Sequence, residues 1–371
     1  MTTIHGTCTK TFEPVRDQFA RNFADGQETG ASFCVTHKGK TVVDIWAGDA
    51  APGTPWQQGT LANVWSTTKG ITAICIALLV DRGELSYDDK VSKHWPEFAA
   101  HGKGDITVAQ MLSHQSGLSG LREPTTLEDI YDHALMADRL AAQEPLWEPT
   151  TRSGYHAFTF GFLAGELVRR VTGKTVGAYL RDEIAKPHNL DLFIGLPEQE
   201  EPRVAPLSQG PAPEPLATIS ETQIFTFTNP AISQIAPNDR AWRAAEIPAA
   251  GGFTSATALA HLYALLDAST APDSRPIISR ETLEALRTVR IENEDLILGM
   301  PTRWASGMAM NAFNMYGPNA KTFGHSGWGG SCGFLDPEAS LSAGYVMNKM
   351  GAAVIGDPRS VALISATYDC L

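Results

Sequence analysis

The stretch VWSTTKGITAICIALLVDRGEL, residues 64–85, places a serine and a lysine three positions apart at the start of an apolar segment. Residues i and i+3 of a helix share one face, so the side chains of Ser66 and Lys69 can touch. The run that follows, residues 71–80, is almost entirely apolar, and Gly83 is of a type that commonly ends a helix. The pattern predicts a helix that holds an ammonium group against the core, beside a serine hydroxyl.

This arrangement suits the acylation of a serine. A serine hydroxyl is a weak nucleophile until a base takes its proton, and a desolvated lysine can be that base because burial lowers its pKa. The first turn of a helix also presents free N–H groups and the positive end of the helix dipole, which stabilise an oxyanion. Ser66 and Lys69 are therefore candidate catalytic residues.

The composition indicates a globular protein whose partner is a small molecule. Of 371 residues, 43% are apolar, and 29 Lys and Arg stand against 41 Asp and Glu, a net charge of −12. A surplus of carboxylates argues against nucleic acid and against an anionic membrane as partners. The first residues lack the pattern of a secretory signal, and the longest apolar run, residues 74–80, is too short to span a bilayer.

The cysteines and histidines indicate neither a disulfide framework nor a metal site. The cysteines are five, widely spaced and without a C-x-x-C pair, which is typical of reduced thiols in a cytoplasmic protein. No two histidines stand four residues apart, so we expect no metal site. No cofactor is expected, and the oligomeric state stays open.

The order of predicted elements indicates an α+β fold with one antiparallel sheet built from both chain ends and flanked by helices. Strands are predicted at residues 32–36 and 41–47, and again at 303–310, 322–325, 331–335 and 342–347, before a last helix at 359–368. We expect residues 1–85 and 246–371 to form the sheet domain, and residues 86–245 a mainly helical insertion domain with a Pro-rich surface loop at 197–215. Capping boxes are predicted at Thr107 and Gln110 and at Thr125 and Glu128.

Two further segments carry chemistry. Tyr155 stands in a Gly-flanked turn before an apolar helix, and a tyrosine near a cation is expected to have a lowered pKa and to relay a proton. The segment FGHSGWGGSCGFLDPEASLSAGYVMN, residues 323–348, reads as a Gly-dense strand, a turn and a return strand. Glycines inside a strand indicate close approach by another group, here a substrate.

With these three segments the chain resembles the serine β-lactamase and penicillin-binding-protein superfamily, in its class C-like branch and closest to the family VIII carboxylesterases. Ser66-Thr67-Thr68-Lys69 matches S-x-x-K, Tyr155-His156-Ala157 matches Y-x-N, and His325-Ser326-Gly327 stands at K-T-G. The resemblance implies a β-lactamase/transpeptidase-like fold, Ser66 as the nucleophile and Lys69 with Tyr155 as the base pair. It also implies that the N–H groups of Ser66 and Trp328 form the oxyanion hole.

Two departures from the family pattern separate this chain from enzymes that bind a substrate carboxylate. Ala157 lacks the amide of the family's Asn, and His325 replaces its Lys. With Gly327 and Trp328, these residues form the candidate substrate-binding set. The pattern favours a carboxylesterase for short- to medium-chain acyl esters. A D-amino-acid peptidase or amidase, a weak β-lactamase, an acyltransferase and a non-enzymatic penicillin-binding or sensor protein remain as alternatives.

Other motifs have plainer explanations. Gly329-Gly330-Ser331-Cys332-Gly333 matches G-x-S-x-G, but that elbow requires a helix after the serine, and here a strand and a turn follow. We therefore expect Ser331 not to be the nucleophile. His114 and His156 are expected to hold local structure, and Cys332 to pack in a strand.

Overall fold

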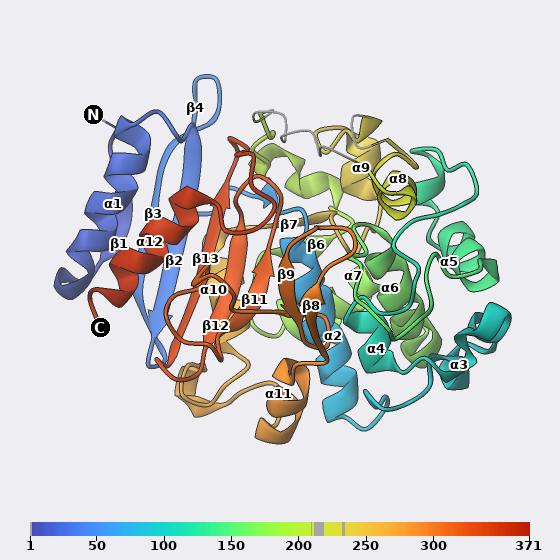
Figure 1. Ribbon diagram of the computed structural model, residues 1–371. Helices are drawn as coiled ribbons and strands as arrows, with labels where there is room; N and C mark the ends of the chain where they lie inside the picture. The colour runs from blue at the N-terminus through green and yellow to red at the C-terminus, as the bar shows by residue number, and fades with distance from the viewer. Residues whose placement is uncertain (1, 209, 211–218, 232–233) are drawn as a thin grey trace.

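An antiparallel sheet joins the two ends of the chain (Figure 1). The computed structural model describes residues 2–208, 210, 219–231 and 234–371. Over these residues the sheet has ten strands, in the order β1-β3-β2-β13-β12-β11-β10-β9-β8, with β4 paired to β3. The strands are β1 His5–Cys8, β2 Gly30–His37, β3 Lys40–Ala51, β4 Thr54–Pro55, β8 Ile291–Glu294, β9 Pro301–Trp304, β10 Ala309–Met310, β11 Phe323–Ser326, β12 Cys332–Asp336 and β13 Leu341–Met347.

The middle of the sheet confirms the predicted fold class. Strand β2 pairs there with β13, which places Cys34 opposite Gly344. The hairpin between β2 and β3 turns at Lys38 and Gly39, both with positive φ, as a two-residue turn that matches the strand twist requires. Both termini thus contribute central strands to a single sheet flanked by helices.

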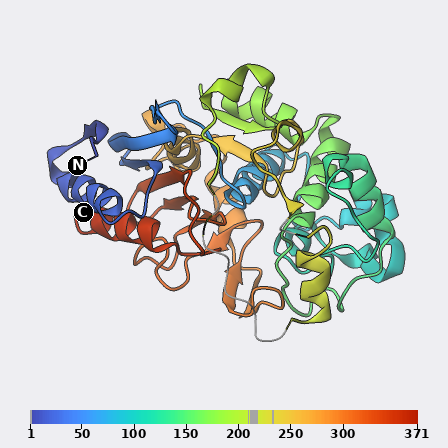
Figure 2. The same ribbon diagram turned by 90° about the horizontal axis from the view of Figure 1, so that it is seen from above.

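Helices cover both faces of this sheet (Figures 1 and 2). Successive strand residues point to opposite faces, so Cys332 faces Ser360 of α12 while a side chain at Gly333 would meet Leu259 of α10. Helices α1 and α12 pack on the first face, and α10 and α2 on the second. The helices are α1 Glu13–Ala24, α2 Thr67–Asp81, α3 Val91–His94, α4 Val108–Leu112, α5 His133–Ala142, α6 Thr159–Thr172, α7 Val176–Leu180, α8 Glu221–Phe227, α9 Arg240–Ala244, α10 Ala256–Ala264, α11 Arg280–Arg287 and α12 Pro358–Tyr368.

Helix α2 lies between the sheet and the mainly helical part of the chain (Figure 2). It contacts β11 on one side and α6 and α7 on the other. Every residue from 67 to 79 is buried, as expected of a helix that is apolar all round. A small second sheet, β5-β7-β6, lies before the N-terminus of α2 and comprises β5 Ala62–Asn63, β6 Leu192–Ile194 and β7 Gly252–Thr254.

The domain boundaries stay a prediction. All strands described in the large sheet fall within residues 1–85 and 246–371, but β6 from the expected insertion pairs with β7 outside it. Among the residues described, no helix combines the length and the apolar character that crossing a bilayer requires.

Three local predictions are wrong. The helix expected after the box at Thr125 and Glu128 begins at His133, where Asp132 caps it. The strand expected at 303–310 is a hairpin of β9 and β10, because Gly307 has a φ of 86° and reverses the chain. Part of the expected loop at 197–215 is a 3₁₀ helix, Glu198–Arg203, while residues 209 and 211–215 of that loop lie outside the described residues.

Candidate active site

Ser66 and Lys69 meet at the N-terminus of α2, as their spacing predicts. Ser66 is the N-cap residue, yet its side chain makes no capping hydrogen bond, so the hydroxyl is free to face Lys69. The Nζ atom of Lys69 lies 3.0 Å from Ser66 Oγ, 2.7 Å from the Ala157 carbonyl oxygen and 3.0 Å from the Ala249 carbonyl oxygen. The lysine side chain is fully buried, whereas Ser66 is only half-buried and can be reached by a substrate.

Burial holds the pKa of Lys69 well below its ordinary value, because desolvation disfavours the ammonium form. A neutral amine keeps two N–H groups, which the carbonyls of Ala157 and Ala249 can accept. Its lone pair is then left for the hydroxyl proton of Ser66. The geometry therefore suits Lys69 as a proton acceptor.

Tyr155 lies in the same constellation, with its ring centroid 4.7 Å from Lys69 Nζ. The expectation that a neighbouring cation lowers its pKa is wrong, because burial raises the pKa of Tyr155, against a smaller lowering by its hydrogen bond with Ser66. The phenol therefore keeps its proton at neutral pH. Burial moves the pKa values of Lys69 and Tyr155 apart, lowering that of the amine and raising that of the phenol, so at neutral pH both groups are uncharged.

The backbone around Tyr155 is held on both sides. The N–H of Gly154, on one side of it, donates to the His114 carbonyl at 3.0 Å. The N–H of His156, on the other side, donates to His114 Nδ1 at 3.1 Å. The N–H of Tyr155 itself donates to the buried carboxylate of Asp295 at 2.9 Å. His114 thus holds the turn that carries Tyr155, beyond the loop after its own helix.

The loop between β11 and β12 brings Trp328 to the start of α2. Ser331 is fully buried, and its hydroxyl donates to the Val64 carbonyl at 2.8 Å and lies 3.0 Å from Thr67 Oγ1. Gly327 has no space for a side chain, because a Cβ atom there would overlap the Val64 carbonyl and the Ser331 hydroxyl. Among the described residues, no backbone carbonyl accepts from the N–H groups of Ser66 and Trp328. Both groups are therefore free to donate to a ligand, as an oxyanion hole requires.

Trp65, directly before the nucleophile candidate, is in the left-handed region with a φ of 45°. Such a conformation costs about 1–3 kcal/mol and persists where the surroundings fix it; here the N–H of Trp65 donates to Asn63 Oδ1 at 3.2 Å. The ring centroid of Trp65 lies 5.1 Å from that of Trp328 and 5.7 Å from that of Trp242. These indoles form an apolar wall beside Ser66.

His325 is buried and neutral. Burial lowers the pKa of His325 to about 3. Its Nδ1 donates to the Ser326 carbonyl at 2.7 Å, which leaves Nε2 as an acceptor without a partner among the described residues. The ring stacks on Trp304, which in turn stacks on Tyr155. An uncharged acceptor therefore stands where the family's Lys would place a cation.

The remaining sequence candidates have local contacts. His156 is saturated by Ser116, Leu118 and Gly154, and Cys332 is buried in β12. Ala157 takes part through its carbonyl and not through its side chain. Sequence reasoning missed the roles of Ala249, Asp295 and Trp304. The first acts through its backbone, which carries no residue signature, and the other two come from a distant segment.

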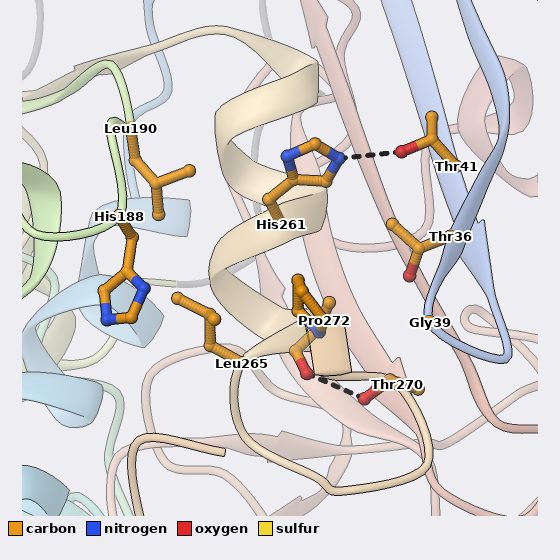
Figure 3. A pocket seen from close by; sticks show the side chains of 10 residues that line it. Thr36, Gly39, Thr41, His188, Leu190, His261, Leu265, Thr270 and Pro272 are labelled. Atoms are coloured by element: carbon orange, nitrogen blue, oxygen red, sulfur yellow. Dashed lines mark hydrogen bonds between the residues drawn. The ribbon is translucent and has the colours of Figure 1, made fainter. Parts of the chain in front are cut away.

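A separate cavity of about 160 Å³ lies between α10 and the β2–β3 hairpin (Figure 3). Its walls include His261, which is hydrogen bonded to Thr41 at 2.9 Å, and His188 on the opposite side. None of its lining residues belongs to the Ser66 constellation, and it is smaller than the roughly 300–1,000 Å³ of ligand pockets. It is not the site of the Ser66 chemistry.

Comparison with known proteins identifies the family. A protein-family model described as Beta-lactamase matches residues 16–366. The chain belongs to the Beta-lactamase family. The resemblance to the serine β-lactamase and penicillin-binding-protein superfamily is thereby confirmed.

Several known proteins are similar over 94% or more of this chain. The chain is 35% identical to "Esterase/beta-lactamase LipL" of Mycobacterium tuberculosis, over 94% of this chain and 83% of that protein. A crystal structure of a family VIII carboxylesterase matches with 44% identity and a TM-score of 0.93, and a penicillin-binding protein homologue from Caulobacter crescentus with 44% identity and a TM-score of 0.95. Both structures are covered over 100% of each chain.

Proposed function

We propose that this protein is a serine hydrolase that forms an acyl-enzyme on Ser66 and cleaves esters of short to medium acyl chains. The observation that carries the proposal is the 3.0 Å separation of Lys69 Nζ and Ser66 Oγ, with the lysine fully buried and its pKa lowered by desolvation. A base within hydrogen-bond distance of a serine is what activates that serine as a nucleophile. The likeness to a family VIII carboxylesterase over the whole chain supports the ester as substrate.

The residues take the following parts in the proposed reaction. Ser66 Oγ attacks the ester carbonyl while Lys69 accepts its proton, and the N–H groups of Ser66 and Trp328 stabilise the oxyanion. The tetrahedral intermediate collapses as the alcohol leaves with a proton from Tyr155, which regains one from the Lys69 ammonium. Water then attacks the acyl-enzyme by the same route in reverse, and its proton returns to Ser66 as the carboxylic acid leaves.

The walls of the site support an apolar acyl or alcohol group. The indole of Trp65, the residue before Ser66, lies with its ring centroid 5.1 Å from that of Trp328. Neutral His325 offers an acceptor and no charge, so a substrate carboxylate gains no ion pair there. The small-molecule partner and the cytoplasmic location inferred from the sequence belong to this proposal.

Hydrolysis of β-lactams is a second candidate, because the relative LipL is named as both an esterase and a β-lactamase. A β-lactam presents a carboxylate beside the reacting amide, and recognition of that carboxylate gains from a cation or several donors. With His325 neutral and Ala157 without an amide, we expect this activity to be weak.

A panel of p-nitrophenyl esters of increasing chain length tests the proposal, alongside nitrocefin and a D-amino-acid anilide. Wild-type protein and Ser66→Ala are compared, and mass spectrometry follows the acyl group on the intact chain. The expected result is ester turnover by the wild type and none by Ser66→Ala, with the acyl mass on the peptide that contains Ser66. Turnover of the anilide above every ester would assign the protein to amide chemistry instead.

A further inference from the structure

The loop Gly327–Ser331, which carries Trp328, is fixed from the side of the nucleophile and also from behind. From the front, Ser331 donates to Val64, two residues before Ser66. From behind, the carbonyl of Gly329 accepts from Arg359 Nη2 at 2.6 Å and from the N–H of Gly351 at 2.8 Å. The loop that carries Trp328 is therefore held, one residue beyond it, by a residue of helix α12 near the far end of the chain.

Arg359 is itself rigidly oriented. Its Nε and Nη2 donate to the two carboxylate oxygens of Asp357 at 2.9 and 3.0 Å, a bidentate pair. Its Nη1 donates to Glu28 Oε2 at 3.1 Å and to the Lys349 carbonyl at 2.8 Å. Tyr345 donates to the other oxygen of Glu28. The guanidinium thus has a carboxylate on each side and one N–H aimed at Gly329.

This cluster is buried, which argues against a role in surface charge. Arg359 is 5% exposed, Asp357 4% and Glu28 7%. Two carboxylates and one guanidinium inside a protein carry a desolvation penalty, so the cluster by itself is weak evidence for stability, and in some proteins such buried groups fix one geometry instead. The loop also packs directly on the cluster: a Cβ atom at Gly330 would lie 2.8 Å from Arg359 Nη2 and 3.1 Å from the carboxylate of Asp357.

We propose that Arg359, oriented by Asp357 and Glu28, is a positioning residue for the oxyanion hole: it holds the Gly329 carbonyl and thereby aims the Trp328 N–H at the reacting carbonyl. The inference rests on the proposed function, since it assigns the Trp328 N–H to the oxyanion. Arginine fits this role better than lysine, because the three N–H groups of a lysine radiate from one nitrogen and cannot form the bidentate pair with Asp357 while also reaching Glu28 and Gly329.

Arg359→Lys tests this role, with Arg139→Lys as the matched control. Arg139 also pairs with two carboxylates, Asp129 and Glu123, but lies on α5 away from the loop. Hydrolysis of a phenyl ester is compared with that of the matching thionoester, whose sulfur gains less from oxyanion donors. We expect Arg359→Lys to lower kcat for the oxygen ester about tenfold or more, a part of the roughly 10²–10³-fold effect of losing one donor.

In the same variant KM stays nearly unchanged and the preference for oxygen over sulfur falls. Amide hydrogen exchange of the peptide that contains Trp328 accelerates, and this readout needs no substrate. Arg139→Lys changes neither the preference for oxygen over sulfur nor the amide exchange of the Trp328 peptide. An unchanged oxygen-to-sulfur ratio together with unchanged exchange overturns the proposal, as does an equal effect in Arg139→Lys.

Asp357→Asn gives a second route should Arg359→Lys fail to fold. The amide keeps the shape and the cap of α12 but weakens the bidentate pair, so the same changes are expected to a smaller extent. A wild type that cleaves no ester contradicts the proposed function alone. In that case the exchange of the Trp328 peptide still decides whether Arg359 holds the loop.

Discussion

The hydroxyl of Ser331 donates to the carbonyl of Val64 at 2.8 Å, and the side chain is fully buried. The serine of the G-x-S-x-G match therefore links the β11–β12 loop to the segment before α2, and its hydroxyl proton is already used in a hydrogen bond. Only Ser66 of the two combines a half-buried hydroxyl with a neighbouring base.

A fluorophosphonate should therefore add its mass to the peptide that contains Ser66, and Ser66→Ala should abolish both the adduct and ester turnover. Ser331→Ala should still be labelled, with the free energy of unfolding lowered by about 0.5–1.5 kcal/mol, because the Val64 carbonyl loses one hydrogen bond and keeps the one from the N–H of Thr67. Peptide mass spectrometry and urea unfolding measure the two effects. An adduct on Ser331 in the wild type would reverse the assignment.

Lys69 and Tyr155 should behave as one unit. We expect Lys69→Ala and Tyr155→Phe each to remove most of the activity, and the double variant to be little worse than either, because groups that share one proton path are not additive. The measurement is kcat/KM for one ester across the four proteins. Losses that multiply would mean that the two residues act in separate steps.

The pH dependence of activity should report Lys69 and not His325. Because burial lowers the pKa of Lys69, kcat/KM should rise with pH as the amine loses its proton, with the midpoint well below the ordinary value of 10.5. The pKa of His325 is lowered to about 3, so this residue is neutral throughout the accessible range. His325→Gln should leave the midpoint of the acid limb within about one pH unit, which is the usual spread of such values, and a larger displacement would assign the limb to the histidine.

The free energy of unfolding should also depend on pH through the lowered pKa of Lys69. Between the lowered pKa of Lys69 and its unfolded value of 10.5, the unfolded chain binds a proton that the folded protein does not, so the free energy of unfolding rises with pH. Lys69→Met has no titrating group at this position and should lack this pH dependence. Urea unfolding from about pH 7 to about pH 10 should show the wild type gaining stability relative to Lys69→Met, whereas Lys186→Met at an exposed lysine should show no such trend. A constant difference between wild type and Lys69→Met would indicate that the lysine keeps its proton in the fold.

Substrate preference should follow the missing charge at His325. The wild type should cleave p-nitrophenyl acetate or butyrate efficiently and nitrocefin slowly or not at all, because a charged hydrogen bond to a carboxylate is worth about 1.5–3 kcal/mol. His325→Lys should raise kcat/KM for nitrocefin relative to the ester by about tenfold or more, the equivalent of that free energy. The idea fails if the wild type prefers nitrocefin to every short ester tried.

The sequence predicted that Ser66, Lys69 and Tyr155 lie together, as they do in the structure, while their catalytic roles stay a prediction. Three residues of the site could be predicted because their types and spacing match known motifs: Ser66, Lys69 and Tyr155. The contributions of Ala249 and Asp295 could not, since a carbonyl looks alike at every residue and a lone aspartate has no motif. The direction of the Tyr155 pKa shift was also predicted wrongly, because it depends on how deeply the phenol is buried, and only the folded structure shows that.

Helix ends show the same division. Thr107 and Gln110 form the predicted capping box, and Gly173 ends α6 in the left-handed conformation. The box at Thr125 and Glu128 failed by one residue, because Thr126 and Asp129 make the reciprocal hydrogen bonds instead, and they close a turn before the helix. A local pattern with two competing registers is resolved only by tertiary packing.

The pairing of β2 with β13 bears on how this chain is made. The two strands lie side by side in the sheet but near opposite ends of the polypeptide. A ribosome releases β2 and the apolar α2 long before β13 exists, and such distant pairings form slowly. Until synthesis reaches β11 and β12, the strands that contact α2, the hydrophobic surface of this helix stays uncovered on that side, so nascent chains stalled before these strands are expected to depend on chaperones.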